Sequence, residues 1–292
     1  MSANSAEFLY DVKRRVILAI FSDDVLMNLL VLKGGNLLDL VYKVSTRTST
    51  DVDLSMALPF DDLEDAKARF ERSLRDQFSE VGLVLFDFKM QEVPQPIPRD
   101  AMDFWGGYQI TFKLVRQAVF ERWSNDPQKL RIKAEALTDA KRDFCIDISK
   151  FEYCDRRQEE LLDGFTVYCY PPEVFVCEKI RAICQQNPAY NSITHSHTRP
   201  RPKDFVDLYH VLQKFSIDFT SQDFQETLRA VFHAKRVPFN YLSEIAAFRD
   251  FHASTFHEVK ATTHPDVVLR EFSFYFDWLL KRLALLEALW NE

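Results

Sequence analysis

The chain has 292 residues, of which 47% are hydrophobic and 28% are charged. This balance is that of a globular protein and excludes a disordered, collagen-like or low-complexity chain. The length predicts about two domains with a sizeable core, and 26 phenylalanines indicate that the core is rich in aromatic rings. A net charge of −7 argues against a surface that coats nucleic acid, but it leaves room for a local basic groove.

Neither the apolar runs nor the cysteines indicate a membrane or secreted protein. The longest apolar run lies near residues 25–32 and is interrupted by Asn28, whereas a bilayer span needs about 20 apolar residues. The first ten residues lack the basic-then-apolar order of a secretion signal. The five cysteines form no Cys-x-x-Cys pair, so we expect buried thiols and a cytoplasmic protein with no membrane partner.

The first half of the chain mixes helical and strand-like patterns. Apolar residues spaced four apart predict a helix over 6–21, and a charged amphipathic pattern predicts another over 60–81. A short apolar run at 29–32 precedes a segment with helical spacing at 36–42. Alternating patterns predict the strands 51–56, 82–92, 107–115, 144–149 and 165–170.

The second half has helical patterns only. The pair Pro171-Pro172 predicts a helix start, and the segment 191–202 is expected to be a flexible loop. The predicted helices are 173–186, 202–215, 221–232, 241–257 and 265–289. The sequence therefore predicts an α+β fold, with a mixed-sheet domain at 1–168 and an all-helical domain at 169–292 that completes the cleft of the first.

Two of the six glycines stand side by side at Gly34-Gly35, after an apolar run and before a helix. Adjacent glycines let the backbone approach a ligand closely, and a helix start offers N–H groups to an anion. A plain strand-to-helix turn is the alternative interpretation. The other pair, Gly106-Gly107, precedes a strand with no carboxylate nearby, and we interpret it as a turn.

A pair of carboxylates, Asp51 and Asp53, follows Gly35 with fifteen residues between. Residues i and i+2 of a strand point to the same face, and two neighbouring carboxylates repel each other unless a cation lies between them. Mg²⁺ is the expected cation because it prefers oxygen ligands and binds triphosphates. A solvated strand edge is the alternative, since Asp-x-Asp alone is common.

A third carboxylate, Asp147, stands in the middle of a short apolar strand at 144–149. Burial of an unpaired acid is costly, and a metal ion would compensate that cost. An edge position with access to solvent would do the same.

These elements together resemble the layout of the nucleotidyltransferase fold related to DNA polymerase β. The segments 33–42, which begins Lys-Gly-Gly, and 47–54, Arg-Thr-Ser-Thr-Asp-Val-Asp-Leu, are similar to the L-K-G-G and R-x-S-x-D-x-D motifs of AbiEii/AbiGii-type toxins. That family includes the MenT-like nucleotidyltransferases. Its later motifs, a helical Lys and R-x-K-D-x-x-D-L, match 178–181 and 201–208, so the resemblance spans roughly residues 30–210.

The resemblance implies a metal-dependent transfer of a nucleoside monophosphate from an NTP. In such an enzyme, Asp51, Asp53 and Asp147 would hold Mg²⁺ ions about 4 Å apart, which bind the triphosphate and activate the attacking hydroxyl. Lys179 and Asp204 would join these three as catalytic residues. The resemblance implies that the nucleotide-binding residues are Lys33, Gly34, Gly35, Ser49 and Lys179.

Two residues near the first motifs, Asn36 and Ser49, carry polar side chains beside the predicted site. Asn36 stands where the family more often has a small hydroxyl residue. Ser49 lies two residues before Asp51, so a phosphate on Ser49 would compete with the triphosphate for cation and space. Because relatives are silenced by phosphorylation in this region, we hypothesise such a switch at Ser49.

The region from Lys179 to Lys203 contains no acidic residue. Such a basic segment is suited to phosphate contact, and we expect Arg199, Arg201 and Lys203 to bind RNA. A second basic stretch at 113–142 is diluted by acids. A solvated surface is the alternative for both. His195 and His197 have no third ligand at suitable spacing, so we expect a loop there and no metal site.

The resemblance favours a tRNA 3′ end as the acceptor, and a toxin neutralised by a cognate antitoxin. Transfer to a protein hydroxyl or to a small molecule keeps the same chemistry with another acceptor. A catalytically inactive relative that binds only RNA or a partner is the third hypothesis. The intact set of Asp51, Asp53 and Asp147 argues against it.

Overall fold

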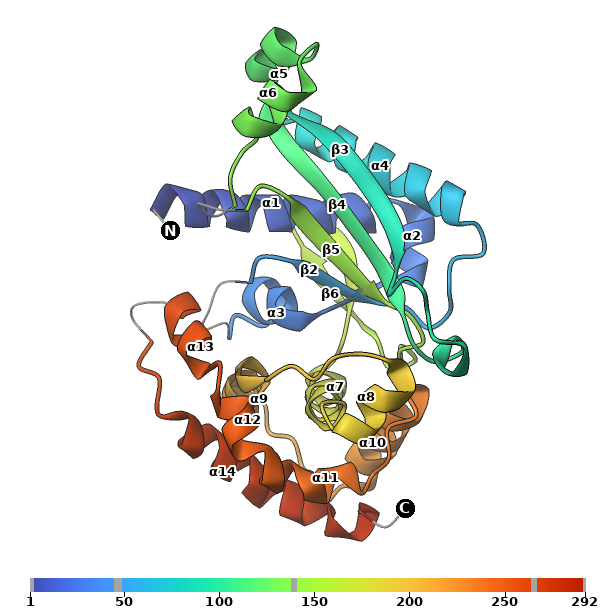
Figure 1. Cartoon of the computed structure of the whole chain (residues 1–292), viewed down its shortest axis with the longest axis vertical. Helices are drawn as coiled ribbons and strands as arrows, with labels where there is room; N and C mark the ends of the chain where they lie inside the picture. The colour runs from blue at the N-terminus through green and yellow to red at the C-terminus, as the bar shows by residue number, and fades with distance from the viewer. Residues whose placement is uncertain (1–2, 45–48, 138–140, 264–266, 291–292) are drawn as a thin grey trace.

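The computed structural model describes residues 3–44, 49–137, 141–263 and 267–290. Within them, one mixed sheet crosses the middle of the molecule, two long helices cover its upper side, and a helical half lies below it (Figure 1). The predicted α+β fold is confirmed.

The described residues form one sheet of seven strands in the order β3-β4-β5-β2-β1-β7-β6. The central strand β2 pairs antiparallel with β1 and parallel with β5, and this arrangement makes the sheet mixed. The three strands that carry the sequence motifs are thereby neighbours. The strands are β1 (Val31–Lys33), β2 (Val52–Ser55), β3 (Leu83–Val93), β4 (Gly107–Arg116), β5 (Phe144–Ser149), β6 (Gln158–Leu162) and β7 (Phe165–Cys169).

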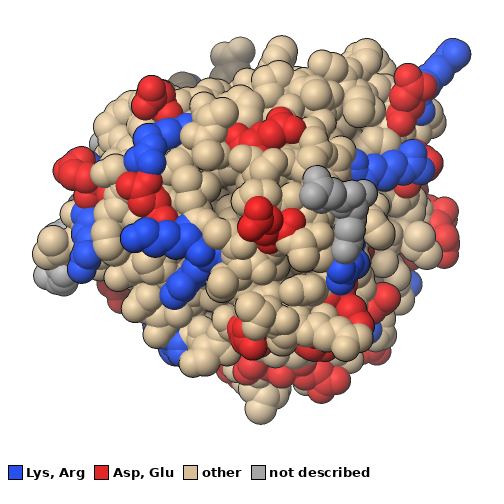
Figure 2. All heavy atoms as spheres, turned by 90° about the horizontal axis from the view of Figure 1, so that it is seen from below, with Lys and Arg blue, Asp and Glu red and all other residues tan. Residues whose placement is uncertain are grey.

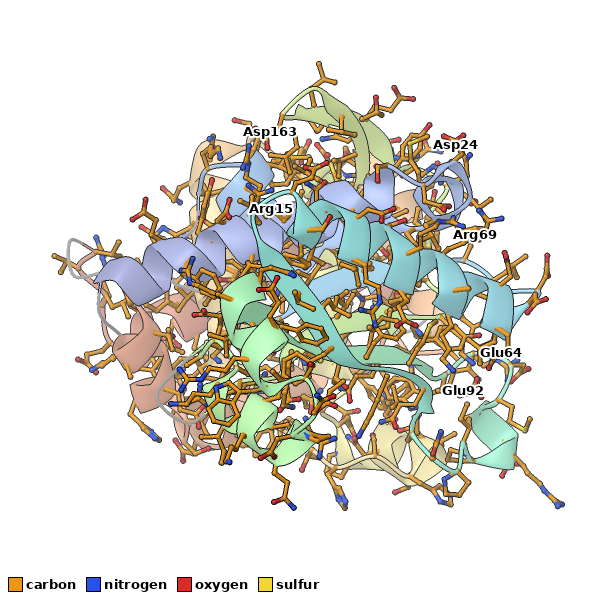
Figure 3. The ribbon with its side chains drawn as sticks, turned by 90° about the horizontal axis from the view of Figure 1, so that it is seen from above. Arg15, Asp24, Glu64, Arg69, Glu92 and Asp163 are labelled. Carbon is orange, nitrogen blue, oxygen red and sulfur yellow. The ribbon has the colours of Figure 1, made fainter. Side chains whose placement is uncertain are left out.

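Helices α1 (Ala3–Phe21) and α4 (Leu63–Ser79) lie side by side over the sheet (Figures 1 and 3). Four residues of α4 at successive four-residue spacings are buried, as an amphipathic helix requires. Arg69 of α4 bonds Asp23, the N-cap of α2 (Asp24–Leu29), and Figure 3 shows Arg69 close to the start of that helix. The buried residues of α4 are Ala66, Phe70, Leu74 and Phe78.

Strands β3 and β4 extend beyond the rest of the sheet and lead to α5 (Gln117–Trp123) and α6 (Pro127–Lys133), at the top of Figure 1. These two helices were not predicted. Each has seven residues, and Leu130 is the one buried residue of these two helices. Helices this short and this exposed leave no apolar periodicity in the sequence.

Helix α7 (Pro172–Cys184) lies between the sheet and the other helices of the lower half, and its residues from Val174 onward are buried. Most lower helices follow the predictions, with two corrections. Residues 191–194, expected in a loop, belong to α8, and the single helix expected over 241–257 is broken into short pieces. The other helices are α8 (Pro188–Thr194), α9 (Pro202–Lys214), α10 (Gln222–Ala234), α11 (Tyr241–Glu244), α12 (Arg249–Ala253), α13 (Phe256–Thr262) and α14 (Phe272–Leu283).

The last predicted helix, 265–289, is found in part. Helix α14 and a following 3₁₀ turn, Ala284–Leu289, account for its second half. Residues 265 and 266 lie outside the described part of the chain.

One hydrophobic cluster runs through both halves of the molecule. It joins Phe112 of the sheet, Phe175 of α7 and Phe276 of α14. Strand β7 ends at Cys169 and α7 begins at Pro172, where the sequence places a boundary. The division into domains at 168/169 stays a prediction.

Among the described helices, none has a stretch that is both long and apolar enough to cross a bilayer. The described cysteines are all free thiols. Burial is confirmed for Cys169, Cys177 and Cys184, whereas Cys145 and Cys154 are half-buried.

Candidate active site

Four polar side chains stand in one row across four neighbouring strands. Lys33 of β1 is paired with Asp53 of β2, and Asp53 is paired with Asp147 of β5. Asp147 in turn is paired with Gln109 of β4, whose Nε2 donates to Asp147 Oδ1 at 3.0 Å. Directly paired residues share a face, and neighbouring strands lie about 4.8 Å apart. The sheet therefore places two carboxylates side by side, between a lysine and a glutamine.

Gly34 makes room for the central carboxylate of this row. Its φ is +69°, and a Cβ at this position would overlap the carboxylate of Asp53. A Cβ on Gly35 would lie 2.9 Å from Ser49 Cβ. Gly34 is thus required both by its left-handed backbone and by the close approach of Asp53, whereas Gly35 is required by the close approach of Ser49.

Asp51 departs from the sequence interpretation. It lies in a bend just before β2, which begins at Val52, so it does not extend the row of Asp53. Its Oδ1 accepts a hydrogen bond from Lys141 Nζ at 2.8 Å, and its carbonyl oxygen accepts one from Asn36 Nδ2 at 2.6 Å. Asn36 is therefore a support for the Asp51 backbone. Residues 47 and 48 of this motif lie outside the described residues.

Burial raises the pKa of the Asp53 carboxyl to about 6, with Lys33 and Lys179 opposing and Asp147 adding to the rise. Two neighbouring carboxylates of this kind fit a hard divalent cation, because the cation relieves their repulsion and prefers oxygen. Within the described parts of the chain, no group of three His, Cys, Asp or Glu residues is close enough to hold a metal. The row therefore offers two ligands, and Asp51, which the sequence predicts as a third, is bonded to Lys141.

The helical half brings two cations to the sheet. Lys179 Nζ lies 2.6 Å from Asp204 Oδ1 and 3.3 Å from Asp207 Oδ2. Arg201 donates to the other oxygen of Asp204. Burial alone would raise the pKa of Asp204, but Arg201 and Lys179 hold it far below its usual value. The two aspartates thus fix Lys179 as an ammonium ion beside the cleft.

A buried ionic network centred on Glu152 joins the two halves of the chain. Its carboxylate lies 2.9 Å from Arg181 Nη2 and 3.5 Å from both Lys33 Nζ and Lys235 Nζ. Burial would raise the pKa of Glu152, but Arg181, Lys235 and Lys33 together lower it to about 2. Burial, Arg181 and Lys33 lower the pKa of Lys235 to about 8. Sequence reasoning missed Glu152 and Lys235, because no local motif surrounds either residue.

A cavity of about 410 Å³ lies between this row and the helical half, a size typical of small-molecule sites. Its lining includes Asp53 and Asp147 at the sheet. Of the predicted RNA-binding residues it includes Arg201, whereas Arg199 is exposed and Lys203 is half-buried. The basic residues that line it are Lys33, Lys179, Arg181, Arg201 and Lys235.

Residues 15–279 of the chain match a family model described as nucleotidyl transferase AbiEii toxin, type IV toxin–antitoxin system. The fold is similar to that of JHP933 from Helicobacter pylori, with 16% identity, a TM-score of 0.48 and coverage of 100% of this chain and 98% of that one. An antigenic nucleotidyltransferase-like protein from Paracoccidioides brasiliensis is similar with 16% identity, a TM-score of 0.37 and coverage of 78% and 93%. A search among proteins of curated function finds no match.

The first testable prediction concerns Gly34. Gly82 has the same φ of +69°, but a Cβ there would meet no atom within 4 Å. Gly82→Ala therefore costs only the strain of a left-handed residue, about 1–2 kcal/mol. Gly34→Ala adds the overlap with Asp53, for about 1–3 kcal/mol more. Chemical denaturation of both variants measures the difference, and equal losses would show that Asp53 is not packed against Gly34.

The second prediction concerns Glu152. Glu152→Gln leaves Arg181, Lys33 and Lys235 without their shared buried carboxylate, so the free energy of unfolding should fall by about 3–5 kcal/mol at neutral pH. Glu159→Gln, on an exposed residue of β6, is the matched control and should change it by less than about 0.5 kcal/mol.

The same pair of proteins gives a pH test. The pKa of Glu152 is lowered on folding from 4.5 to about 2, so its contribution to stability is complete above pH 4.5 and is lost as the pH falls through that interval. The stability difference between the wild type and Glu152→Gln should therefore shrink as the pH falls from 4.5 towards 2. A difference that does not change with pH would contradict the ionised state of Glu152.

Proposed function

The chain belongs to the AbiEii family of nucleotidyl transferase toxins of type IV toxin–antitoxin systems, and from this premise we propose that it transfers a nucleoside monophosphate from an NTP to the 3′ end of a tRNA. That it is a nucleotidyltransferase follows from the family. The observation that best supports this reaction in the chain itself is the row of Lys33, Asp53 and Asp147 facing a cavity lined by cations.

Mg²⁺ is the metal that we propose for this site. Asp53 and Asp147 would hold it from the sheet, and Asp51 would join them on release from Lys141. When bound, Mg²⁺ neutralises phosphate charge and lowers the pKa of the attacking hydroxyl.

The chain's own residues supply the binding of the triphosphate. We assign to Gly34, which lines the cavity, and to its neighbour Gly35 the contact of the backbone with phosphate that the family motif implies. Lys179 and Arg201 line the same cavity from the helical half and face the developing negative charge. Asp204 touches both of these cations, so we assign it the positioning of Lys179 and Arg201.

Asp147 is held by Gln109, whose Nε2 donates to its Oδ1 at 3.0 Å. This hydrogen bond leaves the other oxygen of Asp147 for the metal ion that we propose. Lys33, held by Ser149 Oγ at 3.0 Å and by Glu152, balances the charge of the row from the β1 side.

Ser49 remains the residue that we propose for regulation. It is half-buried beside Gly35, and its Oγ lies 3.3 Å from the Asp51 carbonyl oxygen. A phosphate on this hydroxyl would bring negative charge next to the carboxylates and oppose NTP binding.

We propose RNA as the acceptor because the segment that ends at Lys203 contains no acidic residue. Arg199 is exposed and Arg201 reaches the cavity, so the segment leads from the surface to the site. The face of the helical half in Figure 2 carries both signs of charge interspersed. We therefore place the RNA contacts at the cavity edge and not on this face. A cognate antitoxin is the partner that the family implies.

The third prediction tests the reaction. Asp53→Asn and Asp147→Asn should each reduce the labelling of total tRNA from α-³²P-labelled NTPs in the presence of Mg²⁺ by on the order of a hundredfold or more. The reason is that each substitution removes a carboxylate from the row while the size of the side chain stays the same. Asp155→Asn, on an exposed residue, is the control and should keep full activity.

Three other outcomes would each contradict one part of this proposal. Label in protein would replace RNA by a protein hydroxyl as the acceptor. Activity that survives EDTA would contradict the metal, and labelling that persists in both Asn variants would contradict the assignment of the row as the catalytic centre.

A further inference from the structure

The cavity extends past the carboxylate row to a second end, which has no role in the transfer reaction as proposed above. That end is lined by Val93, Pro94 and Trp105 from the sheet side and by Gln185 and Lys235 from the helical half. We propose that Trp105 stacks on the base of the incoming NTP and makes the base, as well as the triphosphate, a source of affinity. This inference rests on the proposed function and names the second half of its nucleotide site.

The strand register gives the spacing between the two ends. Gln109 is paired with Asp147 in the carboxylate row, and Trp105 precedes Gln109 by four residues. At about 3.3 Å per residue, Trp105 lies at most about 13 Å from the row along the strand direction. This is the reach of a nucleoside whose α-phosphate lies at the carboxylates.

Two glycines next to Trp105 form part of the cavity wall. Gly106 has a φ of +110°, and a Cβ on Gly107 would overlap the carbonyl oxygen of Ile148. Both glycines line the cavity. The sequence interpretation of this pair as a turn is therefore incomplete, because the pair also contributes bare backbone to the wall that follows Trp105.

The indole of Trp105 is held in place before any ligand arrives. The ring of Tyr190 meets the indole edge-on, with 5.9 Å between the ring centroids. The backbone N–H of Trp105 donates to Ala101 O at 2.8 Å. Tyr190 is fixed in turn, since its hydroxyl donates to Lys235 O at 2.7 Å and accepts from Gln185 Nε2 at 3.0 Å. A rigid ring that is half-buried and faces a cavity loses little entropy on stacking.

One cavity joins this aromatic end to the cations at Lys179 and Arg201, so a single molecule with an aromatic part and a polyphosphate part spans both. Lys235 Nζ lies over the Trp105 ring, 5.6 Å from its centroid, so a cation borders the ring at this end of the cavity. The incoming NTP has this chemistry, and every base offers a π face to an aromatic side chain.

The experiment compares NTPs with inorganic tripolyphosphate, which lacks base and ribose. Calorimetric titrations of the full chain with Mg²⁺ and no RNA would give the affinity for each of the four NTPs and for tripolyphosphate. The wild type should bind at least one NTP about fivefold or more tightly than tripolyphosphate, as expected for one stacked base. Trp105→Ala should lose this advantage and keep its affinity for tripolyphosphate, whereas Trp105→Phe should retain most of it.

Trp123→Ala is the matched control, because Trp123 lies in α5 at the far end of the sheet, outside the cavity lining. It should leave both affinities unchanged. The inference is overturned if Trp105→Ala keeps the advantage of the NTP, or if it loses both affinities together without rescue by Phe. A wild type that binds no NTP would overturn the proposed function as well, and the two failures are thereby told apart.

Discussion

The burial of the Asp53 carboxylate against Gly34 is the constraint on which the rest of the site depends. An ionised carboxylate inside a protein is costly unless charges around it compensate, and burial raises the pKa of Asp53 to about 6. The strand order places Lys33 on one side of it and Asp147 on the other. The glycine and the lysine are therefore consequences of keeping one acid at the centre of a sheet, whereas Asp147 adds to the cost of burying it.

The cavity is close to neutral, because four carboxylates accompany the five basic residues in its lining: Asp53, Asp147, Glu152 and Glu178. Each of these cations has an acidic partner: Glu152 lies near Lys33, Arg181 and Lys235, and Asp204 near Lys179 and Arg201. A triphosphate that enters must therefore share these cations with carboxylates. This favours a nucleotide that arrives with its own divalent cation, because the complex carries less charge than the free triphosphate. The same pairing keeps the two halves joined at Glu152, so the cleft is formed in the absence of nucleotide.

The sequence could predict the parts of the site that are local. The strand carrying Asp53, the strand carrying Asp147 and the glycine pair are each signalled by neighbouring residues, and the sheet places them together. Glu152, Lys235 and Trp105 could not be found in this way. They reach the cavity through contacts between segments far apart in the chain. The pattern of apolar and polar residues does not reveal that a charged side chain is buried, because it treats every charged residue as polar. The broken helix over 241–257 has the same cause, since helical spacing alone does not show where tertiary packing ends a helix.

Asp51 shows how the two kinds of information combine. The Asp-x-Asp motif singles out a pair of acids, but β2 begins at Val52, and so the first acid lies outside the strand ladder. Its partner Lys141 is 42% exposed and Asp51 itself 34%, and contacts between such exposed charges contribute about 0–1 kcal/mol. Asp53 and Asp147, in contrast, are fixed by strand pairing. A divalent cation at the row would therefore find two rigid ligands and one that it can take from Lys141 at little cost, so metal binding and nucleotide binding need no rearrangement of the sheet.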